Sequence, residues 1–268
     1  MILLDGRVAR EHHTQLLIER VKNLSVTPCL TIIQVGNRPD SDSYVKAKKS
    51  FAEKVGIQIN HIQLDEKISQ NDLLSTIKKY NEDDSTQGII VQLPLPEHIK
   101  SDIILESVNQ KKDVDGLTCN PKFMPATAKG VKELLRFYKI ELAGKKVTVL
   151  GRSKLVGGPI AQMCHEEGAK VTVCHSTTEN IPEKTKSADI VIVAIGKPQL
   201  INENYLTKGQ IVIDVGITRH IEEGLVGDVD FEKVKDIVKM ITPVPGGVGQ
   251  MTVLALFENL IDACYDIV

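Results

Sequence analysis

Apolar runs alternate with segments of helical periodicity along the first 100 residues. The run 29–35 is short and rich in β-branched residues, which favours a strand, whereas 43–55 has the apolar spacing of a helix. The predicted strands of this half are 29–35, 57–64 and 87–93, and the predicted helices are 16–24, 43–55 and 69–80. Strands separated by helices predict a mostly parallel sheet that is covered by helices.

The same alternation restarts after a loop at 111–125. Here the runs 189–195 and 210–215 are nearly continuous in apolar residues, which is typical of central strands in a parallel sheet. The predicted strands are 146–150, 170–174, 189–195, 210–215 and 238–241, and the predicted helices are 130–139, 157–168 and 251–267. We therefore expect an α/β protein of two domains, the second with its own doubly wound sheet. The last helix could cover either domain.

Composition excludes several classes of protein. With 42% hydrophobic and 25% charged residues, the 268-residue chain is typical of a folded protein. Its net charge of −2 provides no basic field for nucleic acid. No apolar run is long enough to predict a membrane span. We expect small-molecule ligands and a cytoplasmic protein.

The cysteines and histidines do not have the spacing of a metal site. The five cysteines are widely spaced, without a C-x-x-C pair, so neither a zinc site nor a disulfide framework is predicted. This usage fits a reducing compartment. The histidines lack ligand spacing with carboxylates or cysteines, so we expect no bound metal.

A glycine-containing loop follows the predicted strand 146–150. It begins Gly151-Arg152-Ser153, and the next glycine is Gly157, where a helix is predicted to begin. A tight turn into a helix N-terminus suits the pyrophosphate of a dinucleotide. Ser153 replaces the second glycine of the G-x-G-x-x-G pattern and Gly157 comes one residue late, so a plain strand-to-helix turn remains the alternative.

The end of the next strand indicates which dinucleotide is bound. Sites for NAD carry an acidic residue there, which binds the ribose 2′-hydroxyl. This chain has Cys174-His175-Ser176 instead. Ser176, with Arg152 in the preceding loop, would favour a 2′-phosphate, so the sequence predicts NADP.

Polar residues in the first half suggest a second site. Tyr44 and Lys48 lie four residues apart and so share one helix face, although packing of the ring on the lysine stem is the alternative. Gln92 ends an apolar strand, at the sheet edge where ligands of α/β proteins bind. Asp115 lies in the turn Asp113-Val114-Asp115-Gly116, and a glycine-rich loop follows at 242–249.

Together these stretches resemble the bifunctional methylenetetrahydrofolate dehydrogenase/cyclohydrolase family. They occur in the family's order and span nearly the whole chain. The matching stretches are Tyr44-x-x-x-Lys48, 91–96, 112–116, Gly151-Arg152-Ser153 with Val156-Gly157, His175-Ser176, 214–217 and 242–249. The resemblance implies NADP-dependent oxidation of 5,10-methylenetetrahydrofolate, hydrolysis of the methenyl product to 10-formyltetrahydrofolate, and a homodimer.

The resemblance also implies the roles of single residues. Lys48 resembles the catalytic lysine, Gln92 the residue that positions it, Asp115 the carboxylate that binds the pterin, and Tyr44 the ring that stacks on the folate. Further substrate contacts would be Leu93, Pro94, Pro245, Gly246 and Gly247. The NADP contacts would be Gly151, Arg152, Ser153, Val156, Gly157, His175, Ser176, Gly196 and Ile217.

The implied domains are a folate-binding catalytic domain at 1–120, completed by the helix segment 246–268, and a Rossmann NADP-binding domain at 121–245. Folate and cofactor are expected to meet in a cleft between them. The chain departs from the family's pattern in a shortened segment before Pro125, in Ala126-Thr127-Ala128, and at Gln250.

Three alternatives remain at this point. One is a dehydrogenase without cyclohydrolase activity, which the shortened segment keeps open. Another is a two-domain dehydrogenase that acts on a different substrate, such as a shikimate-like acid. The last is a dinucleotide-sensing protein that kept the fold and lost the chemistry.

Overall fold

The computed structural model describes residues 1–220 and 224–265, and of Asp40 the backbone alone. The chain forms two compact units. We call residues 13–126, together with the chain from Leu256, the three-strand unit; residues 1–12 and 127–255 form the six-strand unit. The two-domain α/β fold predicted from the sequence is confirmed.

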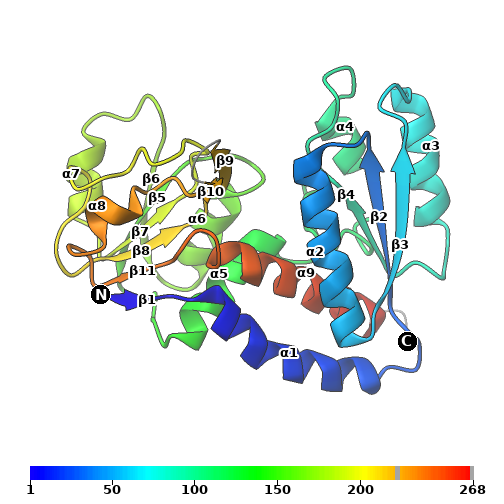
Figure 1. Ribbon diagram of the computed structural model, residues 1–268, viewed down its shortest axis with the longest axis horizontal. Helices are drawn as coiled ribbons and strands as arrows, with labels where there is room; N and C mark the ends of the chain where they lie inside the picture. Colours follow the sequence, from blue (N-terminus) through cyan, green and yellow to red (C-terminus); the bar gives the residue numbers. More distant parts are fainter. Residues whose placement is uncertain (221–223, 266–268) are drawn as a thin grey trace. The chain divides into compact units, whose positions relative to one another are not determined.

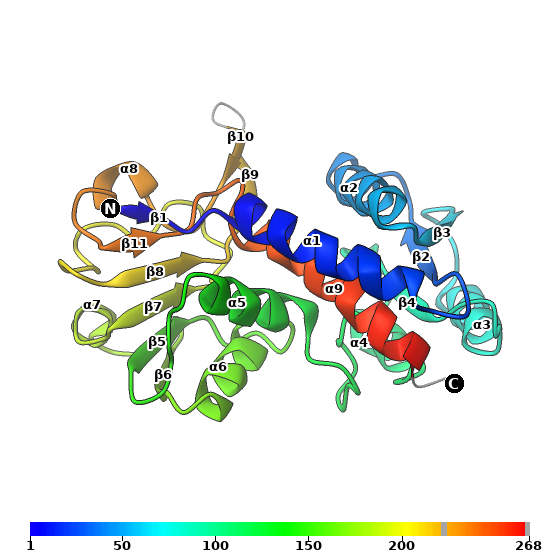
Figure 2. The same cartoon turned by 90° about the horizontal axis from the view of Figure 1, so that it is seen from below.

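The three-strand unit is built on a parallel sheet of order β3-β2-β4. Its helices α2 and α3 lie on opposite faces of that sheet (Figures 1 and 2). The elements are β2 (Cys29–Val35), α2 (Pro39–Val55), β3 (Gln58–Leu64), α3 (Gln70–Asn81), β4 (Gly88–Val91) and α4 (Ser101–Glu106). The central strand β2 is buried from Leu30 to Val35, as expected for a strand covered on both faces.

Local sequence explains where the helices of this unit begin and end. Pro39 opens α2 at a position where a missing N–H costs nothing, and Gly56 ends it in the left-handed region with φ of 79°. Ser69 caps α3, because its hydroxyl accepts a hydrogen bond from the Asp72 N–H at 3.2 Å. The capping residues therefore fix where α2 ends and α3 begins.

The second half of the last helix, α9 (Val248–Tyr265), belongs to the three-strand unit. Phe257 packs edge-on against Phe51 of α2, with ring centroids 5.3 Å apart. Asn259 donates from Nδ2 to the carbonyls of Val114 and Met124 at 2.9 and 3.0 Å. These buried contacts join the end of the chain to this unit. The last residues of the predicted helix, 266 and 267, lie outside the described residues.

The six-strand unit contains a parallel sheet of order β1-β11-β8-β7-β5-β6. Helices α5 and α6 lie on one side of it and α7 and α8 on the other (Figure 1). The strands are β1 (Ile2–Leu3), β5 (Lys146–Leu150), β6 (Lys170–Cys174), β7 (Ile190–Val193), β8 (Ile211–Asp214) and β11 (Met240–Ile241). The helices are α5 (Ala126–Phe137), α6 (Gly157–Glu166), α7 (Ile181–Lys186) and α8 (Phe231–Val234). A short antiparallel pair is formed by β9 (Thr218–His220) and β10 (Gly224–Val226).

The first residues of the chain pack in a different unit from the one that the sequence predicts. Residues 1–12 were assigned to the first domain, but β1 pairs with β11 in the six-strand sheet, and Leu4 N–H donates to the Ile241 carbonyl at 2.8 Å. A strand of two residues has no detectable periodicity, so the sequence did not reveal it. Helix α1 (Gly6–Lys22) begins ten residues before the predicted segment and runs from the six-strand unit into the three-strand unit.

Candidate functional site

A buried lysine lies at the centre of the predicted catalytic residues. Lys48 is on α2, its side chain is 9% exposed, and its Nζ donates to Gln92 Oε1 at 2.9 Å. Tyr44 lies one turn earlier on the same helix and is 40% exposed. The structure therefore brings Lys48 and Gln92 together and leaves much of the tyrosine ring at the surface.

Gln92 is held in a single orientation. It follows β4, and its backbone N–H donates to the Ile33 carbonyl of β2 at 2.8 Å. Its side-chain Nε2 donates to the Leu93 carbonyl at 2.8 Å. Because a carbonyl can only accept, the amide nitrogen must face Leu93 and the amide oxygen must face Lys48. Pro94, also a predicted substrate contact, follows Leu93 through a cis peptide bond.

The two carboxylates of the turn 113–116 have different surroundings. Asp113 accepts hydrogen bonds from the Gly116 N–H, the Thr118 N–H and the Thr118 hydroxyl, at 3.0, 2.9 and 2.8 Å. These contacts hold the turn, in which Gly116 has φ of 72°. Asp115 accepts no such hydrogen bond from the described residues, so its half-buried carboxylate keeps its acceptor capacity for a ligand.

Lys48 and Asp115 influence each other's protonation. Burial lowers the pKa of Lys48, and the negative charge of Asp115 opposes that shift. Burial raises the pKa of Asp115, while Lys48 lowers it and Asp113 raises it. In both residues desolvation is the largest cause, so each group is shifted toward its neutral form. A lysine whose pKa is lowered releases its proton more readily, which suits proton transfer.

The glycine-containing loop 151–157 of the six-strand unit, which we call the phosphate loop after its predicted role, is closely packed. Gly151 has φ of 112°, and a Cβ there would lie 2.1 Å from the Ala194 carbonyl oxygen. A Cβ on Gly157 would lie 2.3 Å from the Gly151 carbonyl oxygen. Ser153 Oγ accepts from the N–H groups of Val156 and Gly157 at 3.2 and 3.3 Å, at the start of α6. Only glycine fits at positions 151 and 157, as a backbone cradle for phosphates requires.

The predicted 2′-phosphate residues follow neighbouring strand ends. Leu150 pairs with Cys174, and the Gly151 N–H donates to the Cys174 carbonyl at 2.8 Å. Arg152 and Ser176, which come directly after these positions, are both exposed. His175 is half-buried, and its Nδ1 lies 3.0 Å from the Thr177 hydroxyl. This sheet edge carries no carboxylate between positions 174 and 178.

The remaining predicted residues also belong to the six-strand unit. Gly196 follows β7 and Ile217 follows β8, where Ile217 is 42% exposed. Gly246 accepts from the Gly6 N–H at 2.8 Å and faces the Arg7 guanidinium. Pro245 and Gly247 flank it in the loop after β11, with Pro245 preceded by a cis peptide bond. The three loop residues predicted to contact substrate thus belong to the unit that contains the phosphate loop.

Two buried carboxylates of this unit are not among the predicted site residues. Asp214 ends β8 and Asp228 follows β10, and both are buried. An aspartate at the end of the apolar run 210–215 was the available signal.

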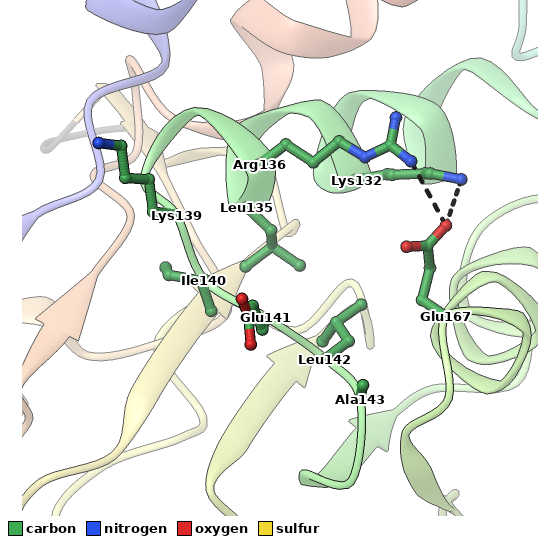
Figure 3. Close-up of a pocket in the computed structure, with 9 residues that line it drawn as sticks. All are labelled: Lys132, Leu135, Arg136, Lys139, Ile140, Glu141, Leu142, Ala143 and Glu167. Carbon is green, nitrogen blue, oxygen red and sulfur yellow. Dashed lines mark ion pairs between the residues drawn. The ribbon is translucent and has the colours of Figure 1, made fainter.

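An open pocket elsewhere in the six-strand unit contains none of the predicted site residues (Figure 3). It is lined mainly by the end of α5 and the segment that follows it. Glu167 forms ion pairs there with Lys132 and, at 3.6 Å, with Arg136. The pocket therefore shares no lining residue with either candidate site.

Two further observations concern metal ions and membranes. Among residues 1–220 and 224–265, no three histidine, cysteine or acidic side chains gather as a metal site would require. In the same ranges, no helix has the length and apolar character needed to span a bilayer.

Comparison with known proteins identifies relatives along nearly the whole chain. Residues 4–115 match the catalytic domain, and residues 125–267 the NAD(P)-binding domain, of the tetrahydrofolate dehydrogenase/cyclohydrolase family. The chain is 44% identical to the bifunctional protein FolD of Bacillus subtilis over 271 residues, which cover 97% of this chain and 96% of that protein.

Solved structures agree. The bifunctional FolD methylenetetrahydrofolate dehydrogenase/cyclohydrolase of Campylobacter jejuni is 41% identical, with a TM-score of 0.95 over the full length of both chains. The Trypanosoma brucei enzyme, solved with NADP cofactor and inhibitor, is 34% identical with a TM-score of 0.93, and the match covers 100% of this chain and 98% of that one. The family domains, the full-length relatives and the shared fold together establish that this chain belongs to the tetrahydrofolate dehydrogenase/cyclohydrolase family.

Proposed function

We propose that the protein oxidises 5,10-methylenetetrahydrofolate to the 5,10-methenyl compound with NADP, and then hydrolyses that compound to 10-formyltetrahydrofolate. The observation that carries this proposal is the buried Lys48–Gln92 hydrogen bond, with Asp115 as its electrostatic partner. We assign folate binding to the three-strand unit and NADP binding to the six-strand unit. Family membership supports both assignments.

The oxidation requires positioning of the two reactants. The nicotinamide, when bound, accepts a hydride from the methylene carbon, and the folate nitrogens supply the electrons that stabilise the resulting cation. No side chain has to take a proton in this step. The residues of the chain therefore act by holding the reactants together, with Tyr44 stacking on the folate and Asp115 accepting hydrogen bonds from the pterin.

The hydrolysis requires proton movement. Water adds to the methenyl carbon, and one of its two C–N bonds then breaks. We assign the proton transfers to Lys48, whose burial lowers its pKa. The cationic substrate would lower that pKa further, because like charges disfavour the ammonium form. Gln92 holds Nζ in place without adding a charge, so the lysine can lose its proton and regain it.

The residues of the phosphate loop fit NADP. Gly151 and Gly157 leave the space that a backbone cradle for the pyrophosphate needs. Arg152 and Ser176 would bind the 2′-phosphate at the adjacent strand ends, where no carboxylate stands between positions 174 and 178 to repel it. These features favour NADP over NAD.

Of the alternatives, a dehydrogenase without cyclohydrolase activity is less well supported. Lys48, Gln92 and Asp115 are all present, and the relatives described above are bifunctional. Family membership sets aside a dehydrogenase for another substrate. Retention of the buried lysine argues against a sensor without activity, because a protein with no catalytic task has no reason to keep a desolvated amine.

We further propose a cytoplasmic homodimer. Strand β6 is an edge of the six-strand sheet, and Val173 on it is 40% exposed. An exposed edge strand is a template for pairing with another chain, so β6 is a candidate interface between two copies. The reduced state of buried Cys164, Cys174 and Cys264 fits a reducing compartment.

The proposed function is tested by mixing purified protein with methylenetetrahydrofolate and following the absorbance of the reduced cofactor, once with NADP and once with NAD. Hydrolysis of the methenyl compound is then measured without cofactor. Faster reduction with NADP and loss of methenyl absorbance are expected. Reduction mainly with NAD would contradict the roles of Arg152 and Ser176, and absence of hydrolysis would contradict the role of Lys48.

A further inference from the structure

Two buried carboxylates, Asp214 and Asp228, lie near the strand ends that carry the predicted cofactor residues. Asp214, at the end of β8, is 3% exposed and Asp228 is fully buried. Asp214 Oδ1 accepts from the Gly216 and Asp228 N–H groups at 2.9 and 3.0 Å, and its Oδ2 accepts from the Val229 N–H at 2.9 Å. Asp214 thereby fixes the backbone of Asp228.

Two glycines provide the space for this pair. A Cβ on Gly216 would lie 2.2 Å from the Asp228 Cγ, and a Cβ on Gly227 would lie 1.9 Å from Asp214 Oδ2. Any larger residue would displace a carboxylate. The arrangement therefore depends on two separate segments, with Asp214 and Gly216 in one and Gly227 and Asp228 in the other, that pack together in the structure.

Asp228 orients the backbone that follows β7. Its Oδ2 accepts from two consecutive N–H groups, those of Ile195 and Gly196, at 2.7 and 2.8 Å. These peptides are trans, so their carbonyls point away from Asp228. One of them is the Ala194 carbonyl, which is the atom that a Cβ on Gly151 would strike at 2.1 Å. The contacts thus run from Asp214 through Asp228 and one peptide to the first residue of the phosphate loop.

Asp228 also carries an unsatisfied atom. Its Oδ1 is buried and has no hydrogen-bond partner among the described residues. Burial raises the pKa of this carboxyl, opposed by the N–H groups that it accepts from. A buried polar atom without a hydrogen bond lowers the stability of the folded protein. Proteins keep such atoms where a function requires them.

We propose that Asp228 is a positioning residue for the dinucleotide. It holds the Ile195–Gly196 backbone so that the Ala194 carbonyl packs on Gly151 and the Ile195 carbonyl faces away from the carboxylate, available as an acceptor for the cofactor. The inference rests on the proposed function only in taking NADP as the dinucleotide. Cofactor affinity would then depend on Asp228, a buried residue that supports the phosphate loop and need not touch the ligand.

The test uses the full-length protein and three measurements on Asp228→Ala. The first is NADPH affinity by calorimetry. The second is hydrogen exchange of the 194–196 amides without cofactor. The third is hydrolysis of methenyltetrahydrofolate without cofactor, which reports on the three-strand unit. The matched control is Asp230→Ala, because Asp230 is a nearby aspartate whose carboxylate caps α8 by accepting from the Lys233 N–H.

For Asp228→Ala we expect a Kd for NADPH raised about tenfold or more, because two hydrogen bonds to a charged acceptor are lost. We also expect faster exchange at 194–196 and unchanged hydrolysis, with wild-type affinity in the control. A wild-type Kd, or equal loss of NADPH binding and hydrolysis, would overturn the proposal. If the wild type itself hydrolysed nothing, the proposed function would fail while the binding comparison remained valid.

If Asp228→Ala does not fold, the same measurements are made on Asp228→Asn. The amide keeps one oxygen that can accept from Ile195 and Gly196, but it loses the charge and buries an NH2 group. We expect a folded protein whose Kd for NADPH is raised about threefold. Wild-type affinity together with wild-type exchange at 194–196 would overturn the proposal.

Discussion

The Nζ of Lys48 donates to Oε1 of Gln92 at 2.9 Å, and the Leu93 carbonyl fixes the orientation of that amide. The glutamine therefore offers the lysine an acceptor that is polar but uncharged. A carboxylate at this position would hold the lysine protonated, whereas the amide allows the burial of Lys48 to lower its pKa. The hydrogen bond between these two residues distinguishes a proton-transfer site from a simple ion pair.

Replacing Lys48 by methionine is expected to separate the two activities. Hydrolysis of the methenyl compound should fall by about 100-fold or more, because the proton-transfer group is removed while the apolar stem is kept. Dehydrogenase activity should be reduced but measurable, since hydride transfer needs no proton from the protein. Lys46→Met, on an exposed position of the same helix, is the control. Full hydrolysis by Lys48→Met would refute the assignment.

Replacing Gln92 by glutamate is expected to change the pH dependence of hydrolysis. The carboxylate would stabilise the ammonium form and raise the pKa of Lys48. If the neutral amine is the active form, the rising limb of the rate against pH should move to higher pH. The measurement is the cofactor-free hydrolysis rate as a function of pH. A limb that stayed in place would show that Lys48 does not titrate in that step.

Asp115→Asn is expected to make stability less dependent on pH. Burial raises the folded-state pKa of Asp115 above its ordinary value of 3.8, so the folded protein binds more protons than the unfolded chain in the window above 3.8. Stability from this group is therefore fully present below pH 3.8 and is lost as pH rises through the folded pKa. The variant should gain stability relative to wild type as the pH rises above 3.8.

Denaturant unfolding of both proteins as a function of pH measures this difference. The reciprocal effect on Lys48 is a further lowering of its pKa, because the Coulombic attraction of Asp115 is gone. That loss offsets part of the gain, so the double variant with Lys48→Met is the informative control. An unchanged pH dependence would mean that Asp115 is not desolvated. Substrate affinity should fall in Asp115→Asn, because a pterin acceptor is lost.

Arg152→Ala is expected to weaken NADP binding much more than NAD binding. The exposed guanidinium is available for the 2′-phosphate, and a charged contact of this kind contributes about tenfold in affinity. Titration of each reduced cofactor gives the two affinities directly. Lys154→Ala, an exposed cation in the same loop, is the control. Equal losses for both cofactors would remove the argument for NADP from this residue.

Local periodicity was sufficient for most of the secondary structure. The predicted segments 29–35, 146–150 and 170–174 agree with the bounds of β2, β5 and β6, because each is a short run rich in β-branched residues that differs from the polar residues around it. The two-residue β1, the short α4, α7 and α8, and the pair β9–β10 were missed. Elements this short hold too few residues to show a period, and neighbouring segments decide their conformation.

The sequence by itself determined the alternation of strands and helices, the glycine turn into a helix at 151–157 and the shared helix face of Tyr44 and Lys48, since each depends on residues a few positions apart. The resemblance points to Asp115, but only the tertiary structure shows why this carboxylate, and not that of Asp113, can accept hydrogen bonds from a ligand. Asp113 is saturated by Gly116 and Thr118, whereas Asp115 is not. The tertiary structure also decided that the Asp228 carboxylate accepts from the Ile195 N–H. The carbonyl of that same peptide, on Ala194, lies against Gly151. Hydrogen-bond partners and desolvation arise when distant segments pack, and no local pattern encodes them.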